Sequence, residues 1–185
     1  MVKKIVGTGV LLVLALALQA GVKMYTLKSP DGKVKLEVTA GQGIAYSLFY
    51  DGRLLLKPSR IALHTDLPEA DHWENIRITG TKQRHVSETV QAPFYRVKEF
   101  GIDCNELELR LNNGFSLLMR AYNDGMAYRF VAGRKGEMTV VEERAEFNFA
   151  DDFEAYIPYS TNPKDPWNMA FQNFYTKAPL TQYNT

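Results

Sequence analysis

The alternation of apolar and polar residues is the feature that most constrains the fold of this chain. From Tyr25 to Phe149, short runs with an apolar residue at every second position are separated by turn-forming residues. Successive side chains of a β-strand point to opposite faces, so this period predicts strands with one face on a core and the other in water. The expected strands are Tyr25–Ser29, Val34–Val38, Ile44–Tyr50, Leu54–Leu56, Ile76–Gly80, Val90–Val97, Glu106–Leu111, Phe115–Tyr122, Met126–Ala132 and Thr139–Phe149.

Turn-forming residues link several of these predicted strands. Asp51-Gly52 separates two apolar runs by two residues, which is a strong short-range signal for a β-hairpin. Pro30-Asp31-Gly32, Asn112-Asn113-Gly114 and Asn123-Asp124-Gly125 supply further turns. Regular strand spacing without a convincing long amphipathic helix predicts an all-β sandwich of two packed, mainly antiparallel sheets.

The first twenty residues have the features of an export signal. Lys3 and Lys4 precede the apolar stretch from Ile5 to Leu18, and small residues follow up to Ala20. The stretch is shorter than the roughly 20 residues of a spanning helix, so we expect cleavage after Ala20 and no membrane span afterwards. An uncleaved N-terminal anchor is the alternative.

This organisation predicts a periplasmic or secreted protein. After residue 149 the alternation ends, and the last part of the chain is rich in aromatic residues and broken by prolines. An aromatic tail of this kind needs a surface to pack against. The expected divisions are a signal peptide at 1–20, a β-sandwich domain at 21–159 and an aromatic exit segment at 160–185.

Charge and cysteine content restrict the possible functions further. The chain has 22 basic and 21 acidic residues, so no excess of positive charge indicates a nucleic-acid partner. The single cysteine, Cys104, cannot form an internal disulfide, and an exported domain of this kind must depend on a hydrophobic core. We expect Cys104 to be a core side chain rather than a nucleophile, because no basic partner is identifiable.

Aromatic and planar polar side chains are the types that carbohydrate sites combine, because aromatic faces cover sugar C–H groups and amides bond hydroxyls. The alternative is that these aromatics pack inside the domain or against a neighbouring one. The residues of suitable type are Trp73, Trp167, Asn168, Phe171, Gln172, Asn173 and Tyr175.

Two clusters of titratable residues are less informative. The residues from His64 to His72 include two histidines and three carboxylates, but their spacing fits no zinc pattern and a solvated loop is expected. Glu142 and Glu143 are neighbours on a predicted strand and therefore point to opposite faces. They cannot form the carboxylate pair of a glycoside hydrolase, which needs a defined separation across a cleft.

Four ordered segments give the chain a family resemblance. They are Ser29–Val34, Leu56–Leu63, Asp124–Phe130, and Ala155–Tyr159 followed by Phe171–Leu180. In these segments the sequence resembles the N-terminal domain of glycoside hydrolase family 97, the exported bacterial α-glucosidases and α-galactosidases that include the SusB type. Order and spacing match over nearly the whole mature chain, and the exit segment would then lead toward a catalytic barrel absent from this chain.

The resemblance implies a β-super-sandwich similar to the galactose mutarotase-like domains, followed by a (β/α)₈ barrel that carries the catalytic groups beyond residue 185. It implies no catalytic residue in this chain. It also implies a glutamate lent to a calcium ion, at the position where this sequence has Gln172. A neutral amide can offer one oxygen to calcium but loses the charge attraction, so a calcium role for this chain is weakened.

Three hypotheses for function follow from these observations. The first is a domain of a periplasmic family 97 glycosidase that associates with an α-linked oligosaccharide or its sugar and supports the barrel. The second is a freestanding sugar-binding module, and the third is an interaction domain that binds no sugar. Glucoside against galactoside preference, linkage, stereochemical outcome and oligomeric state stay open. The expected sugar-binding residues are Trp167, Asn168, Gln172, Asn173 and Tyr175.

Overall fold

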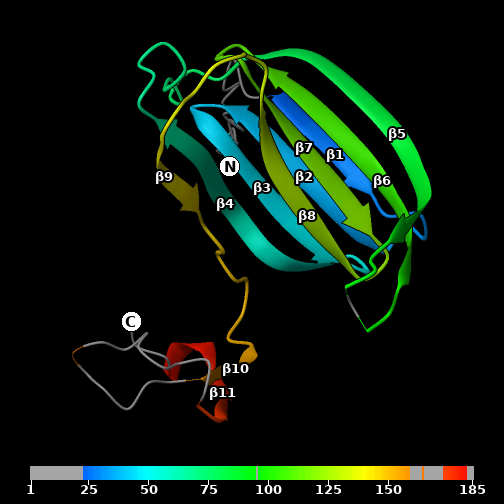
Figure 1. The fold of residues 1–185 in the computed structure, drawn as a ribbon. Coiled ribbons are helices and arrows are strands. Elements are labelled where there is room, and N and C mark those ends of the chain that lie inside the picture. Colours follow the sequence, from blue (N-terminus) through cyan, green and yellow to red (C-terminus); the bar gives the residue numbers. More distant parts are fainter. Residues whose placement is uncertain (1–22, 95, 159–163, 165–172, 183–185) are drawn as a thin grey trace, which may run out of the picture.

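The computed structural model of the chain describes residues 23–94, 96–158, 164 and 173–182. These residues form three antiparallel sheets, two of which pack face to face as a sandwich (Figure 1). The fold is the predicted all-β super-sandwich. None of the described residues forms a helix with the length and hydropathy needed to cross a bilayer.

Sheet A has five strands in the order β1-β2-β3-β4-β9. The strands follow one another along the chain except for β9, which returns late in the sequence to pair with β4. Their bounds are β1 Lys23–Lys28, β2 Val34–Gly41, β3 Gly43–Tyr50, β4 Arg53–Thr65 and β9 Val140–Ala145.

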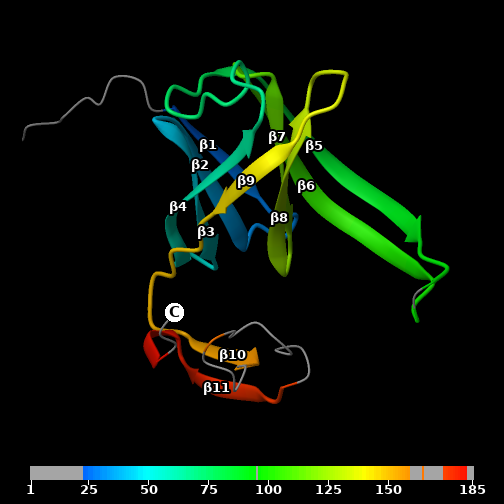
Figure 2. The same cartoon turned by 60° about the vertical axis from the view of Figure 1, so that its left-hand side comes forward.

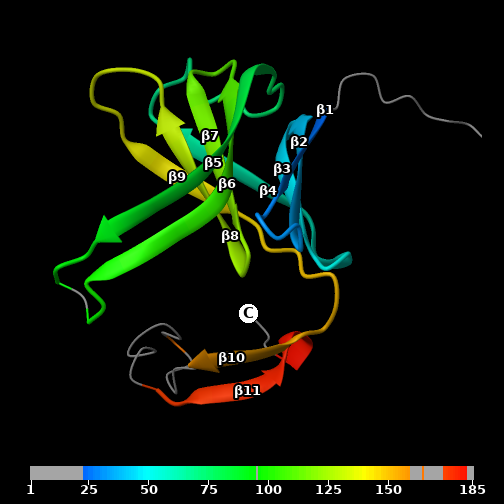
Figure 3. The same cartoon turned by 90° about the vertical axis from the view of Figure 1, so that its right-hand side faces the viewer.

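Sheet B is a meander of four strands in the order β5-β6-β7-β8. The bounds are β5 Ile78–Gln91, β6 Glu99–Leu111, β7 Phe115–Tyr122 and β8 Gly125–Ala132. A separate two-stranded hairpin, β10 Glu154–Pro158 with β11 Tyr175–Pro179, lies beyond one end of the sandwich and is followed by the 3-10 turn Leu180–Gln182 (Figures 2 and 3).

One predicted strand is wrong. Val90–Val97 was expected to be extended throughout, but β5 ends at Gln91 and the chain turns before β6 begins at Glu99. The backbone N–H of Ala92 donates to the carbonyl of Lys98, which closes this turn at 2.7 Å. Pro93 cannot donate to a strand ladder, which explains why the apolar residues on either side of it belong to a loop.

The turns have the backbone geometry that their residues favour. Asp51 and Gly52 both have positive φ angles, of 48° and 79°, which is the requirement of the two-residue turn that joins β3 to β4. Gly32 and Gly114 also have positive φ in the turns predicted for them. These turns set the pairing next to them, although the register of β3 with β4 shifts further along, between Tyr46 and Phe49.

The core lies between sheets A and B and follows the alternation of the strands. β2 and β7 bury every second residue, with Leu36, Val38 and Leu117 fully inaccessible. Trp73, on the connection between β4 and β5, closes one end of the core and packs against Phe115 and Phe130 at ring-centroid distances of 6.1 and 5.2 Å. Its position excludes it from a sugar site on the surface.

Side chains from sheet B hold the free edge of sheet A. The amide of Gln83 on β5 donates to the carbonyl of Thr26 at 3.0 Å, and that of Asn105 on β6 donates to the carbonyl of Lys28 at 2.8 Å. These carbonyls belong to β1, the edge strand of its sheet. The two bonds satisfy acceptors that a ladder partner would otherwise take and join the two sheets along one side.

Cys104 was expected to be a core side chain and is buried, but by register it lies on the face of β6 that points away from the core cluster. It is fully buried on β6, and burial raises the pKa of its thiol. A thiol rather than a thiolate is therefore present at neutral pH, and this form is a weak nucleophile.

Candidate functional site

The segment after β9 runs back along β4 before it leaves the sandwich. The N–H of Asn148 donates to Ser59 Oγ at 2.9 Å, and the N–H of Lys57 donates to the carbonyl of Asn148 at 2.8 Å. Further along, the N–H of Ala150 donates to the carbonyl of Leu55 at 2.9 Å. Residues 146–150 are thus attached to sheet A, and they position the start of the β10–β11 hairpin.

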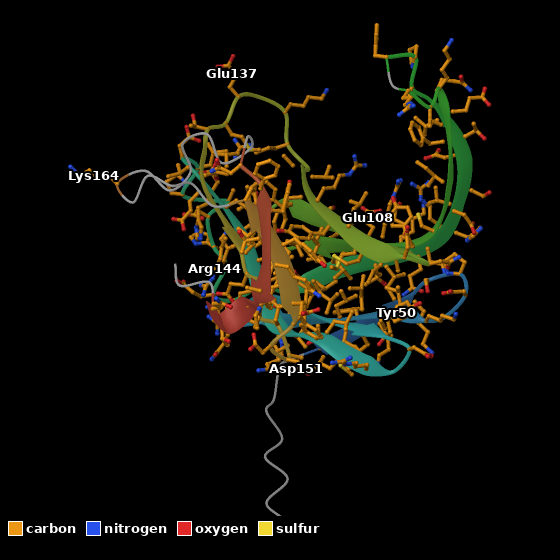
Figure 4. The ribbon with its side chains drawn as sticks, turned by 90° about the horizontal axis from the view of Figure 1, so that it is seen from below. Tyr50, Glu108, Glu137, Arg144, Asp151 and Lys164 are labelled. Carbon is orange, nitrogen blue, oxygen red and sulfur yellow. The ribbon has the colours of Figure 1, made fainter. Side chains whose placement is uncertain are left out.

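Aspartates fix the connection between the sandwich and this hairpin. Asp151 forms an ion pair with Arg53, the first residue of β4, at 3.1 Å, and Figure 4 shows Asp151 near the start of β10. Asp152 accepts from the backbone N–H of Thr181 at 2.9 Å and from its hydroxyl at 2.8 Å. These two bonds hold the pKa of Asp152 below its usual range, and the bond from the backbone N–H has the larger effect. The residues just before β10 and just after β11 are therefore held together at the edge of the sandwich.

The two aspartates line a shallow hollow at this junction, together with Lys57, Phe149 and Thr181. Two carboxylates in one recess are a feature of glycoside hydrolases. Here Asp151 is paired with Arg53 and Asp152 with Thr181. Both carboxylates thus take part in the structural connection between the sandwich and the hairpin.

One face of the hairpin is aromatic and exposed. In the register of β10 and β11, Tyr156 lies opposite Lys177 and Pro158 lies opposite Tyr175, so these four side chains share a face. The rings of Tyr156 and Tyr175 are 61% and 67% exposed. We call this surface the hairpin face. Exposed tyrosine rings of this kind can stack on a sugar or on another protein surface.

An ion pair borders the hairpin face. Lys177 Nζ lies 2.8 Å from a carboxylate oxygen of Glu154 and 5.9 Å from the centre of the Tyr156 ring. The bond to Glu154 raises the pKa of Lys177. The opposite face carries Ala155, Ile157, Thr176 and Ala178, of which Ala178 is buried. The two tyrosines therefore lie on the more exposed face of the hairpin.

The structure places only some of the predicted sugar-binding residues. Tyr175 lies on the hairpin face, and Asn173 precedes β11 and is half-buried. Trp167, Asn168 and Gln172 lie outside the described residues. Tyr156 was not predicted as a site residue, because its place opposite Lys177 depends on a pairing between segments some twenty residues apart.

The two titratable clusters have structural roles. His64 Nδ1 and Asp71 Oδ1 lie 2.7 Å apart, and no group of three or more possible metal ligands is found among the described residues. Glu143 accepts from the hydroxyl of Tyr128 at 3.2 Å, which contributes with burial to raising the pKa of Tyr128 to about 12.

Comparison with known proteins decides the family. The family model described as "Glycosyl-hydrolase 97 N-terminal" matches residues 27–185. The chain belongs to glycoside hydrolase family 97. A retaining α-galactosidase from Bacteroides thetaiotaomicron is 38% identical over 175 residues, which is 91% of this chain and 26% of that protein.

Other family 97 relatives agree with this assignment. A probable retaining α-galactosidase from Streptomyces bingchenggensis is 26% identical over 83% of this chain and 24% of its own length. A family 97 enzyme from Pseudoalteromonas sp. strain K8, solved in complex with acarbose, has the same fold, with a TM-score of 0.67 and 16% identity over 85% of this chain and 25% of that one. The family 97 domain thus spans about a quarter of the length of the curated relatives it matches.

Proposed function

We propose that this family 97 domain is the N-terminal part of an exported α-galactosidase, in which it supports the catalytic barrel and associates with the sugar substrate. The observation that carries the proposal is the 38% identity to the retaining α-galactosidase over 91% of the chain. Catalysis belongs to the barrel in this proposal. The two aspartates at the hairpin junction are engaged in structural bonds, which is consistent with that division.

Sugar association is assigned to the hairpin face and the residues just before β11. Tyr156 and Tyr175 supply exposed rings, while Trp167, Asn168, Gln172 and Asn173 supply a further ring and three amides. Stacking of one sugar face on a ring leaves its hydroxyls to planar amides. The expected ligand is the terminal sugar of an α-linked oligosaccharide.

The described residues of this chain do not provide a complete site for the calcium ion that the family resemblance implies. The described residues contain no group of three or more possible ligands, and Gln172 is neutral where the family has a glutamate. Calcium prefers six to eight oxygen ligands with carboxylates among them. We therefore assign no step to calcium here.

A chimera tests the proposed activity. The whole 185-residue chain replaces the matched N-terminal quarter of the Bacteroides thetaiotaomicron enzyme, and hydrolysis of aryl α-galactoside and aryl α-glucoside is measured. We expect kcat/KM for the galactoside within about tenfold of the parent enzyme, a loss of about 1.4 kcal/mol in transition-state stabilisation. The unfused chain should hydrolyse neither substrate. An inactive but folded chimera, or steady turnover by the repurified chain alone, contradicts the proposal.

Calorimetry tests the sugar association separately. We expect weak binding of galactose by the purified chain, with a Kd on the order of millimolar, and loss of the signal in the Trp167→Ala/Gln172→Ala double variant. Tyr50→Ala, which removes an exposed tyrosine from the β3–β4 turn, is the matched control and should bind like the wild type. Absence of heat at millimolar galactose and maltose would favour an interaction domain that binds no sugar.

A further inference from the structure

The distal half of the β5–β6 hairpin has no lateral neighbour in sheet B. β7 pairs with β6 only along Asn105–Arg110, whereas β5 and β6 stay paired as far as Gln91 and Glu99. Residues 86–91 and 99–104 therefore form a two-stranded arm that extends beyond β7 and ends in the turn between β5 and β6 (Figures 2 and 3). A ribbon of two strands is only marginally stable in water, so a cover on one face would stabilise the arm.

The two faces of the arm differ in polarity. In one set of register pairs, Val86 lies opposite Cys104 and Val90 lies opposite Phe100, and the pair between them joins Ile102 to Glu88, the one charged residue in this stretch of the face. The intervening pairs, such as Ser87 with Asp103 and Gln91 with Glu99, are polar and point the other way. The arm has the alternation of a strand pair that packs one side against a partner.

Exposure along the apolar face rises toward the tip. Val86 and Cys104 at the base are buried, whereas Val90 and Phe100 are 40% and 43% exposed. Beyond them, in the turn, Phe94 is 99% exposed. A contiguous exposed apolar surface of this kind on a soluble domain indicates an interaction site.

The apolar face continues into the outer face of sheet B, on the side away from sheet A. Glu108 lies on this outer face, near the base of the arm in Figure 4. By register, the outer face and the arm together have two more cations than anions. The cations are Lys82, Arg84, Arg110, Arg120 and Arg129, and the anions are Glu88, Glu106 and Glu108.

This charge disfavours a second copy of the chain as the cover. In a two-fold dimer through this surface, the same patch would lie against itself. The excess of cations would then meet its equivalent on the partner, and like charges across an interface oppose association. An acidic surface with apolar residues opposite Val90 and Phe100 fits better.

We propose that the apolar face of the arm and the adjoining outer face of sheet B form the surface on which the catalytic portion of the enzyme docks. This inference rests on the proposed function. The curated relatives are about four times as long as the aligned region, so in them a far larger polypeptide is joined to a domain of this kind. The arm and the β10–β11 hairpin project from the same end of the sandwich (Figures 2 and 3), and the docked portion contacts both.

Hydrogen exchange of the arm tests this surface in the chimera described above. We expect the arm amides to exchange at least about tenfold more slowly in the chimera than in the 185-residue chain alone. Val90→Thr/Phe100→Thr, which keeps branched or strand-compatible residues but removes apolar area, should abolish most of this protection. The matched control is Gln91→Thr/Glu99→Thr, the next register pair on the polar face, and it should retain the protection.

Each outcome separates this proposal from the function on which it rests. An active chimera whose arm exchanges as fast as in the isolated chain overturns the docking surface and leaves the proposed function intact. An inactive chimera with a protected arm contradicts the activity but supports the docking surface. Protection of the arm in the isolated chain that increases with protein concentration shows self-association instead and overturns the proposal.

Discussion

Trp73→Ala is expected to lower the free energy of unfolding of this domain by about 3–5 kcal/mol, as for other buried aromatic residues. Only 6% of Trp73 is exposed. Its indole N–H donates to the carbonyl of Leu63 at 3.1 Å, and its ring packs against Phe130 with a T-shaped geometry. Truncation leaves both a cavity and an unpaired carbonyl. Urea denaturation followed by far-ultraviolet circular dichroism measures the change.

Tyr156→Ala is the matched control for this prediction. Tyr156 is a large aromatic residue on the hairpin face and is mostly exposed, so its truncation should change stability by less than about 1 kcal/mol. An effect of Trp73→Ala as small as that of Tyr156→Ala would show that Trp73 does not close the core. Trp73 was a candidate sugar ligand from sequence alone, and this pair of variants separates the two roles.

Glu106→Gln is expected to destabilise the domain by about 2 kcal/mol. Glu106 is 4% exposed and accepts from Arg84 Nε at 2.7 Å and from Arg120 Nε at 2.8 Å. Removal of the charge leaves two guanidinium groups without their counter-ion. The loss falls below the roughly 3–5 kcal/mol of a fully buried pair, because the Arg84 side chain is 54% exposed.

The pH dependence of this effect has a definite sign. Burial alone would raise the pKa of Glu106, but the hydrogen bonds from Arg84 and Arg120 outweigh it, and the folded-state pKa lies below the ordinary value of 4.5. The stabilisation is therefore present above about pH 4.5 and is lost as the pH falls through the lower, folded-state pKa. The difference in unfolding free energy between wild type and Glu106→Gln should shrink in acid.

Glu108→Gln is the control for Glu106→Gln. Glu108 lies on the same face of β6, but it is half-buried and its contact with Arg110 is long, at 3.4 Å. Its replacement should change stability by less than about 1 kcal/mol. Equal effects of the two substitutions, or a Glu106→Gln effect that grows in acid, would contradict the assignment of the buried ion-pair network.

The sandwich could be predicted from the sequence because strand alternation and turn formation depend on residues that are close together in the chain. Alternation in β2 and β7 indicated which side chains are buried, and Asp51-Gly52 indicated a turn that the backbone angles confirm. The prediction of a strand at Val90–Val97 was wrong because its apolar residues lie at the tip of the arm. There is no core at the tip for alternating apolar side chains to pack against. Apolar content alone does not distinguish a core strand from an interaction surface.

Features that depend on contacts between segments far apart in the sequence could not be predicted from local patterns. Whether Trp73 faces solvent or core depends on Phe115 and Phe130, which follow it by more than forty residues. The hairpin face likewise depends on the pairing of β10 with β11. The sequence supplied suitable residue types for the site, but only the fold shows which of them share a surface.

The bonds from Gln83 and Asn105 to β1 have a consequence for folding kinetics. β1 pairs with its sequence neighbour β2, whereas the bonds on its free edge come from side chains 57 and 77 positions later in the chain and form only once β5 and β6 are in place. Contacts between residues so far apart slow the search for the native topology. Closure of the sandwich along this edge should therefore come late, in a folding reaction that takes milliseconds to seconds rather than microseconds.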